Sequence, residues 1–267
     1  MIPAVWGVVN ATPDSFSDGG RFLDPEAAVS HGRLLAAQGA DVLDVGGEST
    51  RPGAEPVDAA TELTRVLPVV SGLRGVAPVS IDTTKPEVAR AAVAAGATVW
   101  NDVLALRAPG AVEAAAELGC AVVLMHMRGE PRTMQEAPAY ADVTGEVEAF
   151  LLARAAAATA AGVARGRITL DPGLGFGKTA AHNLRLLADL PRLASHGFPV
   201  LVGASRKRTV AAIDAAARDA ADRLGGSLAF ALHAAAHGAA SLRVHDVRET
   251  RQALLVQAAL AEAAAAG

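Results

Sequence analysis

The apolar residues of this chain form two patterns, short unbroken runs and longer segments with helical spacing. The short runs predict strands at 5–9, 42–45, 79–82, 98–101, 121–126, 168–171, 200–204 and 241–245. The longer segments predict helices at 25–38, 59–73, 86–95, 111–118, 143–161, 184–195 and 220–237, with an alanine-rich helix closing the chain. Unbroken apolar strands are typical of parallel sheets covered on both faces. The pattern therefore predicts about eight strand–helix units.

Glycine stands between a predicted helix and the next strand at positions 39, 96, 119, 197 and 238. A glycine there favours a left-handed residue that ends the helix. No linker, low-complexity tract or charge block divides the units, so we predict one domain over residues 1–267. The number and even spacing of the units favour a closed (β/α)8 TIM barrel over the alternative, an open doubly wound sheet. In such a barrel the functional site lies at the C-terminal ends of the strands.

Composition narrows the classes of function. A chain of 267 residues suits one barrel of this kind, for which about 250 residues is typical. The net charge of -4 and the pI of about 6.0 indicate no basic surface, so we expect neither nucleic acid nor membrane as a partner. No apolar stretch is long enough to span a bilayer, and the first apolar run stops at Asn10 without a positive region before it, which is against a signal peptide. The single cysteine, Cys120, allows no internal disulfide and fits a buried residue in a cytoplasmic protein.

Polar residues occupy the ends of the predicted strands, where a barrel has its reactive face. They are Asn10, Asp44, Asp82, Asn101, His126, Asp171, Ser205 and His245. Polar groups crowded at one rim are costly unless they bind one another or a ligand. A structural network accounts for some of them, but hardly for all. Carboxylates and carboxamides together suit the edge of a nitrogen heterocycle, because Asp accepts from ring N–H and amino donors while Asn donates and accepts.

The segment 168–178 joins a predicted strand to a glycine-rich loop. The strand ends at Asp171, and glycines at 173, 175 and 177 let the backbone approach a flat or phosphorylated ligand, with Phe176 beside it. Taken alone, the segment also fits a strand-to-helix turn with incidental glycines. The recurrence of polar strand ends along the chain favours a binding loop.

Basic residues gather after the last two predicted strands, which is the usual phosphate site of this barrel. They are Arg206, Lys207 and Arg208 after the seventh strand, and Arg243 with His245 in the eighth. We therefore expect an anionic part of the ligand there, although a solvated basic turn is the alternative for Arg208. Lysine occurs only at 85, 178 and 207, each time beyond a strand end.

Several motifs in order resemble those of bacterial dihydropteroate synthases, and the resemblance runs from the first strand to the last helix. The motifs are NATPDSFSDGG at 10–20, DVGGESTRPG at 44–53, SIDT at 80–83, ND at 101–102, MHMRG at 125–129, DPGLGFGK at 171–178, SRK at 205–207 and RVHD at 243–246. The resemblance implies a folate-pathway transferase on a TIM barrel. Its substrates would be 6-hydroxymethyl-7,8-dihydropterin pyrophosphate and p-aminobenzoate, and its products dihydropteroate and pyrophosphate.

The resemblance also implies roles for residues that match the motifs. The pterin would bind Asp82, Asn101, Met125, Asp171, Phe176 and Lys207, among which Asp82, Asp171 and Lys207 would be catalytic. Pyrophosphate would bind Asn10, Arg243 and His245, and Asn10 would also hold Mg2+. The p-aminobenzoate, under loops that close as a lid, would contact Phe16, Thr50, Arg51, Pro52 and Ser205. The family tends to dimerise, so a homodimer is expected.

The implied chemistry is dissociative. Pyrophosphate is a good leaving group, and its loss leaves a carbocation delocalised into the pterin, which the amine of p-aminobenzoate captures. No nucleophilic side chain is needed. Asp82 and Asp171 would place negative charge near the cation, while Arg243, His245 and Mg2+ would neutralise the leaving group.

One loop departs from the family pattern. After Lys207 the family usually continues with an aromatic residue and a glycine, whereas this chain has RTVA at 208–211. Substrate affinity or the response to sulfonamides is therefore open. Three alternatives remain: a catalytically weak paralogue that binds pterin, a pterin-binding methyltransferase domain, and a Schiff-base aldolase using Lys207. The methyltransferase should lack both the STRP motif at 49–52 and the basic seventh loop, which are present.

Overall fold

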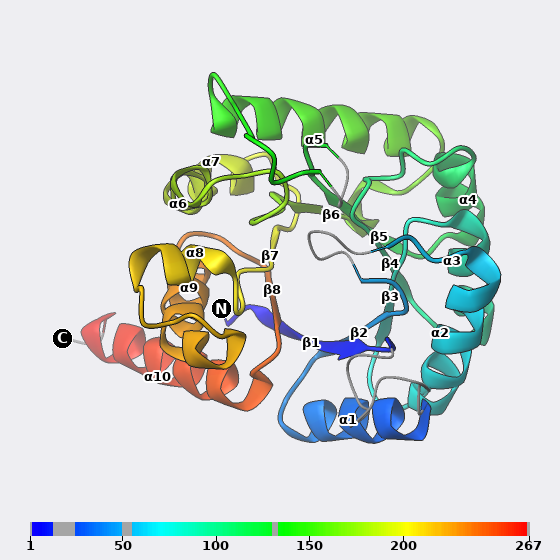
Figure 1. The fold of residues 1–267 in the computed structure, drawn as a ribbon, viewed down its shortest axis with the longest axis horizontal. Coiled ribbons are helices and arrows are strands. Elements are labelled where there is room, and N and C mark those ends of the chain that lie inside the picture. The colour runs from blue at the N-terminus through cyan, green and yellow to red at the C-terminus, as the bar shows by residue number, and fades with distance from the viewer. Residues whose placement is uncertain (1, 13–24, 50–54, 130–132, 266–267) are drawn as a thin grey trace.

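The fold is a barrel of parallel strands enclosed by helices (Figure 1). The computed structural model describes residues 2–12, 25–49, 55–129 and 133–265. Within these residues the strands are β1 (Ala4–Asn10), β2 (Val42–Gly46), β3 (Val79–Asp82), β4 (Val99–Asp102), β5 (Ala121–Met125), β6 (Ile168–Asp171), β7 (Leu201–Val202) and β8 (Ser241–Val244). Their order in the sheet is β6-β5-β4-β3-β2-β1-β8-β7, and every pairing is parallel.

The first and last strands of that order meet and close the barrel. The Leu170 amide donates to the Pro199 carbonyl at 2.9 Å, and Leu170 forms a parallel bridge with Val200. The predicted (β/α)8 TIM barrel is confirmed, and the open doubly wound sheet is wrong. The seam between β6 and β7 is nevertheless thin, because a single bridge replaces the ladders found between the other neighbours.

Helices follow the strands and cover the outside of the sheet (Figure 1). Their bounds are α1 (Pro25–Ala37), α2 (Ala59–Leu73), α3 (Pro86–Ala95), α4 (Ala111–Leu118), α5 (Val143–Ala160), α6 (Ala180–Ala188), α7 (Leu190–Ala194), α8 (Arg208–Ile213), α9 (Leu224–Ala236) and α10 (Val247–Ala265), with 3-10 turns η2 (Arg165–Arg167) and η3 (Ala220–Arg223). The five glycines predicted to end helices all have positive φ angles.

Several elements differ from the sequence prediction. β7 covers only 201–202 of the strand expected at 200–204, and the first four residues of the helix expected at 220–237 form η3. The helix expected at 184–195 is two helices, α6 and α7, which meet at Asp189. Pro191 lies in the first turn of α7, where its missing N–H is tolerated but would have interrupted a continuous helix. The short helix α8 was not predicted, because a single turn and a half carries no clear apolar period.

Alternate side chains of the strands are buried in two different environments. Val5, Leu43 and Ile81 belong to the large apolar core shared with the helices. Trp6 and Val123 belong to a separate cluster with Leu201, as expected for alternate side chains that point into the barrel. The foot of the barrel is therefore apolar, and the polar residues of the strand ends stand above it.

Cys120 lies at the foot of β5, at the opposite end of the strand from the predicted site. Its thiol is buried, and that burial raises its pKa. Among the helices that the structure describes, none is long and apolar enough to cross a membrane.

Candidate active site

Strand register brings the predicted polar residues to one level of the barrel. Asn10 pairs with Gly46, Gly46 with Asp82, and Asp82 with Asn101. Farther round, Met125 pairs with Asp171. Because paired residues of parallel strands project to the same side of a sheet, these side chains share the interior at the C-terminal end of the barrel.

Arg243 of β8 ties two carboxylates together across the interior. Its Nε donates to Asp44 Oδ2 at 2.6 Å, and its Nη2 donates to Asp82 Oδ2 at 2.9 Å. Asn101 Nδ2 lies 3.3 Å from Asp44 Oδ2. Arg243, predicted for pyrophosphate, thus lies against Asp82, which was predicted for the pterin. Asp44 was recognised as a polar strand end but received no role; the structure makes it the buried partner of both Arg243 and Asn101.

Burial dominates the ionisation of Asp82. It raises the pKa of this carboxyl to about 7, against the opposing effect of the Arg243 guanidinium. Burial also raises the pKa of Asp171, and there the Gly173 N–H and the ammonium groups of Lys207 and Lys178 oppose it.

The glycine-rich loop after β6 packs tightly against the end of β5. Gly173 donates its N–H to Asp171 Oδ1 at 2.7 Å and has a φ angle of +66°. A Cβ atom on Gly173 would lie 1.9 Å from the His126 carbonyl oxygen, so no other residue fits this turn without displacing β5. The loop therefore holds Asp171 at the rim and brings Phe176 over the site.

Apolar side chains supply a wall beside these polar groups. Met125 clusters with Val103, Met127 and Met134, and Phe176 packs against them. The predicted residues Met125 and Phe176 thus belong to one surface, suited to the faces of a flat ring. Val103 was missed by the sequence analysis; its place directly after the ND pair at 101–102 was the available signal.

Lys207 closes the site from the side of β7. Its Nζ lies 4.5 Å from the centre of the Phe176 ring, within cation–π range. Burial, and then the nearby Arg243, lower the pKa of Lys207 to about 8. Lys207 is the residue that precedes α8, so its position is fixed by the start of that helix.

His245 and Ser205 meet just beyond the ends of β8 and β7. Ser205 Oγ accepts the His245 backbone N–H at 3.2 Å and lies 3.1 Å from His245 Nδ1. In the tautomer of His245 that carries its proton on Nε2, the Ser205 O–H donates to Nδ1 and the Nε2–H can donate toward an anion. Burial, and then the Arg243 charge, lower the pKa of His245 to about 3, so the ring is neutral at pH 7.

Asn10 is the residue predicted to hold Mg2+. It ends β1 half-buried, at the same level as Asp82. No cluster of three or more His, Cys, Asp or Glu side chains suited to a metal occurs in the described residues. Mg2+ commonly uses one or two protein oxygens together with waters and substrate phosphates, so a single carboxamide at the mouth fits this ion.

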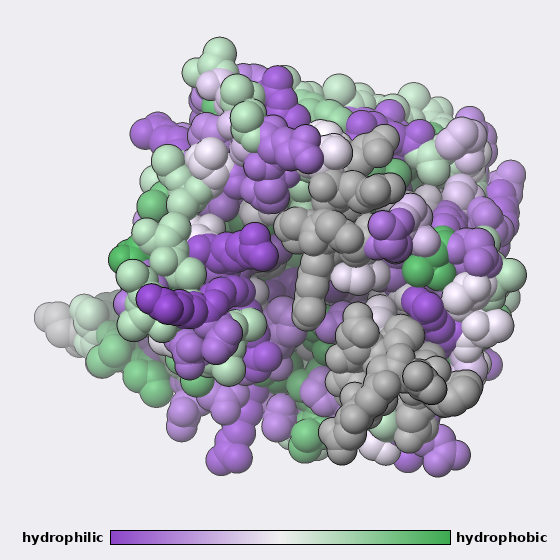
Figure 2. Space-filling model, viewed as in Figure 1, coloured by the Kyte–Doolittle hydropathy of each residue, from purple (hydrophilic) through white to green (hydrophobic). Residues whose placement is uncertain are grey.

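Four residues predicted to contact p-aminobenzoate lie outside the described residues: Phe16, Thr50, Arg51 and Pro52. Figure 2 shows hydrophilic residues over α8 on the face seen in Figure 1.

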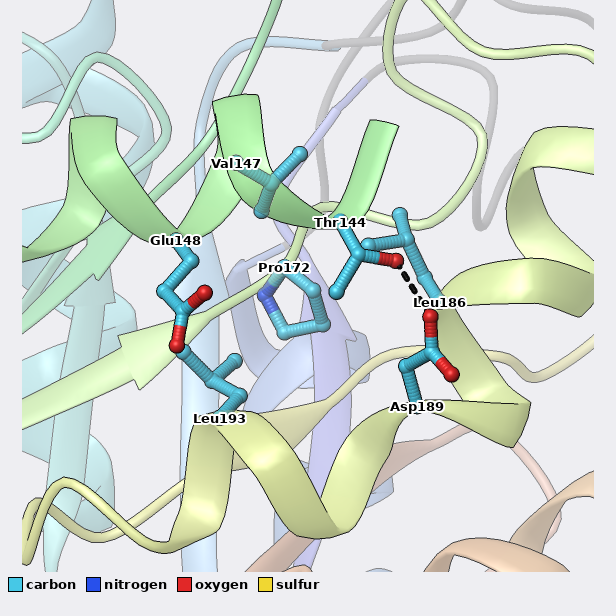
Figure 3. A pocket seen from close by; sticks show the side chains of 7 residues that line it. All are labelled: Thr144, Val147, Glu148, Pro172, Leu186, Asp189 and Leu193. Atoms are coloured by element: carbon cyan, nitrogen blue, oxygen red, sulfur yellow. Dashed lines mark hydrogen bonds between the residues drawn. The ribbon is translucent and has the colours of Figure 1, made fainter. Parts of the chain in front are cut away.

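A small cavity lies between α5 and the pair α6 and α7 (Figure 3). Thr144 bonds Asp189 across it at 2.7 Å, and Pro172 lines it. Its volume of about 10 Å3 is what one water molecule needs, so it is a packing gap and not a substrate site.

Comparison with known proteins places the fold and the site in a family. The model of the family described as pterin binding enzyme matches residues 6–245. The dihydropteroate synthase of Escherichia coli (strain K12) is 48% identical over 256 residues, covering 95% of this chain and 90% of the relative.

Two solved structures from Xanthomonas albilineans are similar over nearly the whole chain. Dihydropteroate synthase with 4-aminobenzoic acid has a TM-score of 0.91 and 53% identity, covering 97% of this chain and 93% of that one. Dihydropteroate synthase in complex with 7,8-dihydropteroate has a TM-score of 0.87 and 50% identity, covering 97% and 94%. The chain therefore belongs to the dihydropteroate synthase family of pterin-binding enzymes.

Proposed function

We propose that this chain condenses 6-hydroxymethyl-7,8-dihydropterin pyrophosphate with p-aminobenzoate to give 7,8-dihydropteroate and pyrophosphate. The similar structures with 4-aminobenzoic acid and with 7,8-dihydropteroate support one substrate and one product of this reaction. The assignment of individual residues rests on the geometry of this chain.

The observation that carries the proposal is the slot formed by carboxylates and a carboxamide beside an apolar wall. Asp82 and Asn101 are register partners on one side of the barrel, and Asp171 lies beside Met125 on the other. A pterin has N–H and amino donors along one edge and flat faces, which matches acceptors at the rim and Met125 with Phe176 against the ring.

The same groups suit a dissociative reaction. When the bond from the pterin methylene to pyrophosphate breaks, the electron pair leaves with pyrophosphate and positive charge spreads into the pterin. The carboxylates of Asp82 and Asp171 stabilise that charge, and the amine of p-aminobenzoate then bonds to the methylene and loses a proton. Arg243 and the neutral His245 donate to the departing anion from β8 and the residue that follows it. Mg2+ held at Asn10 would add positive charge at the pyrophosphate oxygens.

The test is pyrophosphate release by the purified protein. With dihydropterin pyrophosphate and Mg2+, we expect release coupled to dihydropteroate formation only when p-aminobenzoate is added. Pterin binding without product would favour the weak paralogue that binds pterin. Absence of pterin binding would contradict the proposal altogether.

We also propose a homodimer that uses the outer face of α10. Leu255, Val256 and Leu260 are more than half exposed there, and Ile213 at the end of α8 is 62% exposed. Such apolar side chains in contact across a two-fold axis would lose their water. Light scattering should give a dimer for the native chain and a monomer for Leu260→Glu. Leu34→Glu, at an exposed leucine on α1, is the matched control and should stay dimeric.

A further inference from the structure

Lys178 is a buried lysine that the proposed reaction does not use. It ends the DPGLGFGK motif and is only 2% exposed. No carboxylate of the described residues lies within ion-pair distance of its ammonium group. Instead Nζ has four neighbours that accept hydrogen bonds: His126 Nδ1 at 2.9 Å, and the carbonyl oxygens of His126 at 3.2 Å, Gly173 at 2.9 Å and Phe176 at 3.1 Å.

These neighbours adjoin the predicted pterin contacts. His126 directly follows Met125, Gly173 holds the carboxylate of Asp171 through its N–H, and Phe176 is itself part of the apolar wall. One ammonium group thus links the end of β5 to the loop after β6 at the points where both meet the ring site.

Other bonds fasten the same loop at different places. Tyr140 donates to the Gly177 carbonyl at 2.8 Å, and Gln135 donates to the Gly175 carbonyl at 2.6 Å. Asn183 accepts the Gly175 N–H at 2.9 Å. Among the side-chain bonds of the described residues, only those of Lys178 reach the carbonyls of both Gly173 and Phe176.

Burying the ammonium group of Lys178 costs free energy. Burial lowers the pKa of Lys178 to about 7, with Asp171 opposing this and Lys207 adding to it. Burial, and then the Lys178 charge, lower the pKa of His126 to about 3, which keeps the ring neutral and Nδ1 available as an acceptor. A smaller neutral donor could join the end of β5 to the loop after β6 without the free-energy cost of burying a charge.

We propose that Lys178 is a positioning residue for the pterin: its ammonium group fixes the turn at Gly173 and Phe176 against β5, so that Asp171, Phe176 and Met125 face one ring. The inference rests on the proposed function. In this proposal Lys178 does not contact substrate, and the binding of p-aminobenzoate does not depend on Lys178.

The test compares two substrates in Lys178→Met. Binding of 6-hydroxymethyl-7,8-dihydropterin, which lacks pyrophosphate, is measured by calorimetry without Mg2+ at pH 6, below the pKa of about 7 of Lys178, so that the ammonium group is present in the native chain. We expect its Kd to rise about tenfold or more, because breaking buried charged hydrogen bonds loosens the turn. At saturating pterin pyrophosphate, the KM for p-aminobenzoate should change less than about threefold. Lys178→Gln, which keeps a neutral donor, should recover part of the pterin affinity.

Arg165→Met is the matched control. Arg165 stands before β6 at the other end of the barrel, donates to the His196 carbonyl and lies 3.8 Å from the centre of the Phe198 ring. The Arg165→Met substitution also removes a cation that binds a backbone carbonyl, so it should lower the Tm and leave the pterin Kd unchanged.

Three outcomes would overturn the inference. These are native pterin affinity in Lys178→Met, an equal loss of pterin affinity in Arg165→Met, or failure of both Lys178 variants to fold, which would make the lysine purely structural. If the native chain itself bound no pterin, the proposed function would fail first.

Discussion

Two opposing effects set the charge of Asp82. Its burial favours the neutral acid, whereas the Arg243 guanidinium favours the carboxylate, and the balance raises its pKa to about 7. A carboxylate accepts from both donors of a pterin edge, but the protonated acid spends one oxygen as a donor. The affinity of the site for pterin therefore depends on pH near neutrality.

We expect pterin affinity to increase as the pH rises from about 5.5 to 8.5 with a midpoint near 7. Arg243→Met removes the opposing positive charge, so the midpoint should move to higher pH. Asp82→Asn should remove this rise and leave only the opposite effect of Lys178, which loses its proton in the same range. Calorimetric titration with 6-hydroxymethyl-7,8-dihydropterin measures all three, and a midpoint unmoved by Arg243→Met would contradict this account.

At this scale the sequence predicts which residues are at the site better than it predicts their partners. Asp82, Asn101 and Asp171 were predicted from their places at strand ends, and the register brings them to the barrel mouth. The ion pairs of Arg243 with Asp44 and Asp82 join residues far apart in the sequence. Such contacts depend on the order and curvature of the strands, which no local pattern encodes.

The loop after β6 has room only for glycine at position 173. Gly173→Ala should destabilise the fold by about 3 kcal/mol or more, because it adds a left-handed alanine and a clash with the His126 carbonyl. Gly166→Ala is the control, since nothing lies within 4 Å of the added Cβ. Denaturant unfolding measures both, and equal midpoints would show that the loop can move away from β5.

Helix α8 begins where the chain departs from the family pattern. Thr209 is buried, and its Oγ1 accepts from Asn183 Nδ2 at 2.9 Å, while Asn183 Oδ1 accepts the Gly175 N–H. The departing residue is thus connected to the glycine-rich loop through one carboxamide.

Thr209→Val should leave the Asn183 amide unpaired and cost about 1–3 kcal/mol of stability. The KM for the pterin substrate should rise by about threefold because the Gly175 turn loses its support. Thr64→Val, which removes an exposed hydroxyl on α2, should do neither. If Thr209→Val lowers stability but leaves this KM unchanged, the link to the loop has no effect on the site.

Element boundaries show where sequence patterns end. Five predicted elements, at 59–73, 79–82, 86–95, 111–118 and 168–171, match the structure residue for residue. The patterns fail after β6 and β7, where one helix divides at Asp189 and where α8 begins. Both places are short segments shaped by contacts to the barrel, such as that of Thr209 with Asn183.

The whole molecule is a ring with one thin seam. β1 and β2 are joined over five register pairs. The seam beside β7 has only a single bridge, Leu170 to Val200, and the hydrogen bond from the Leu170 N–H to the Pro199 carbonyl. Opening at the seam breaks far fewer hydrogen bonds than opening anywhere along β1 to β5.

Native-state hydrogen exchange should therefore protect the amides of β1 and β2 more than those of Leu170 and β7. Saturating pterin should slow exchange at the seam, because Asp171 on β6 and Lys207 after β7 would bind the same ring. Equal protection around the barrel in the free protein would mean that side-chain packing closes the seam as firmly as the ladders do.

The buried thiol at the foot of β5 makes the chain convenient to label. Cys120 is the only cysteine, it is shielded from solvent, and burial raises its pKa, so little reactive thiolate forms at neutral pH. A cysteine introduced at the mouth would then be the single attachment point for a fluorophore or spin label. The native sequence thus provides a silent background for observing, in solution and one position at a time, how the entrance of the barrel responds to its ligands.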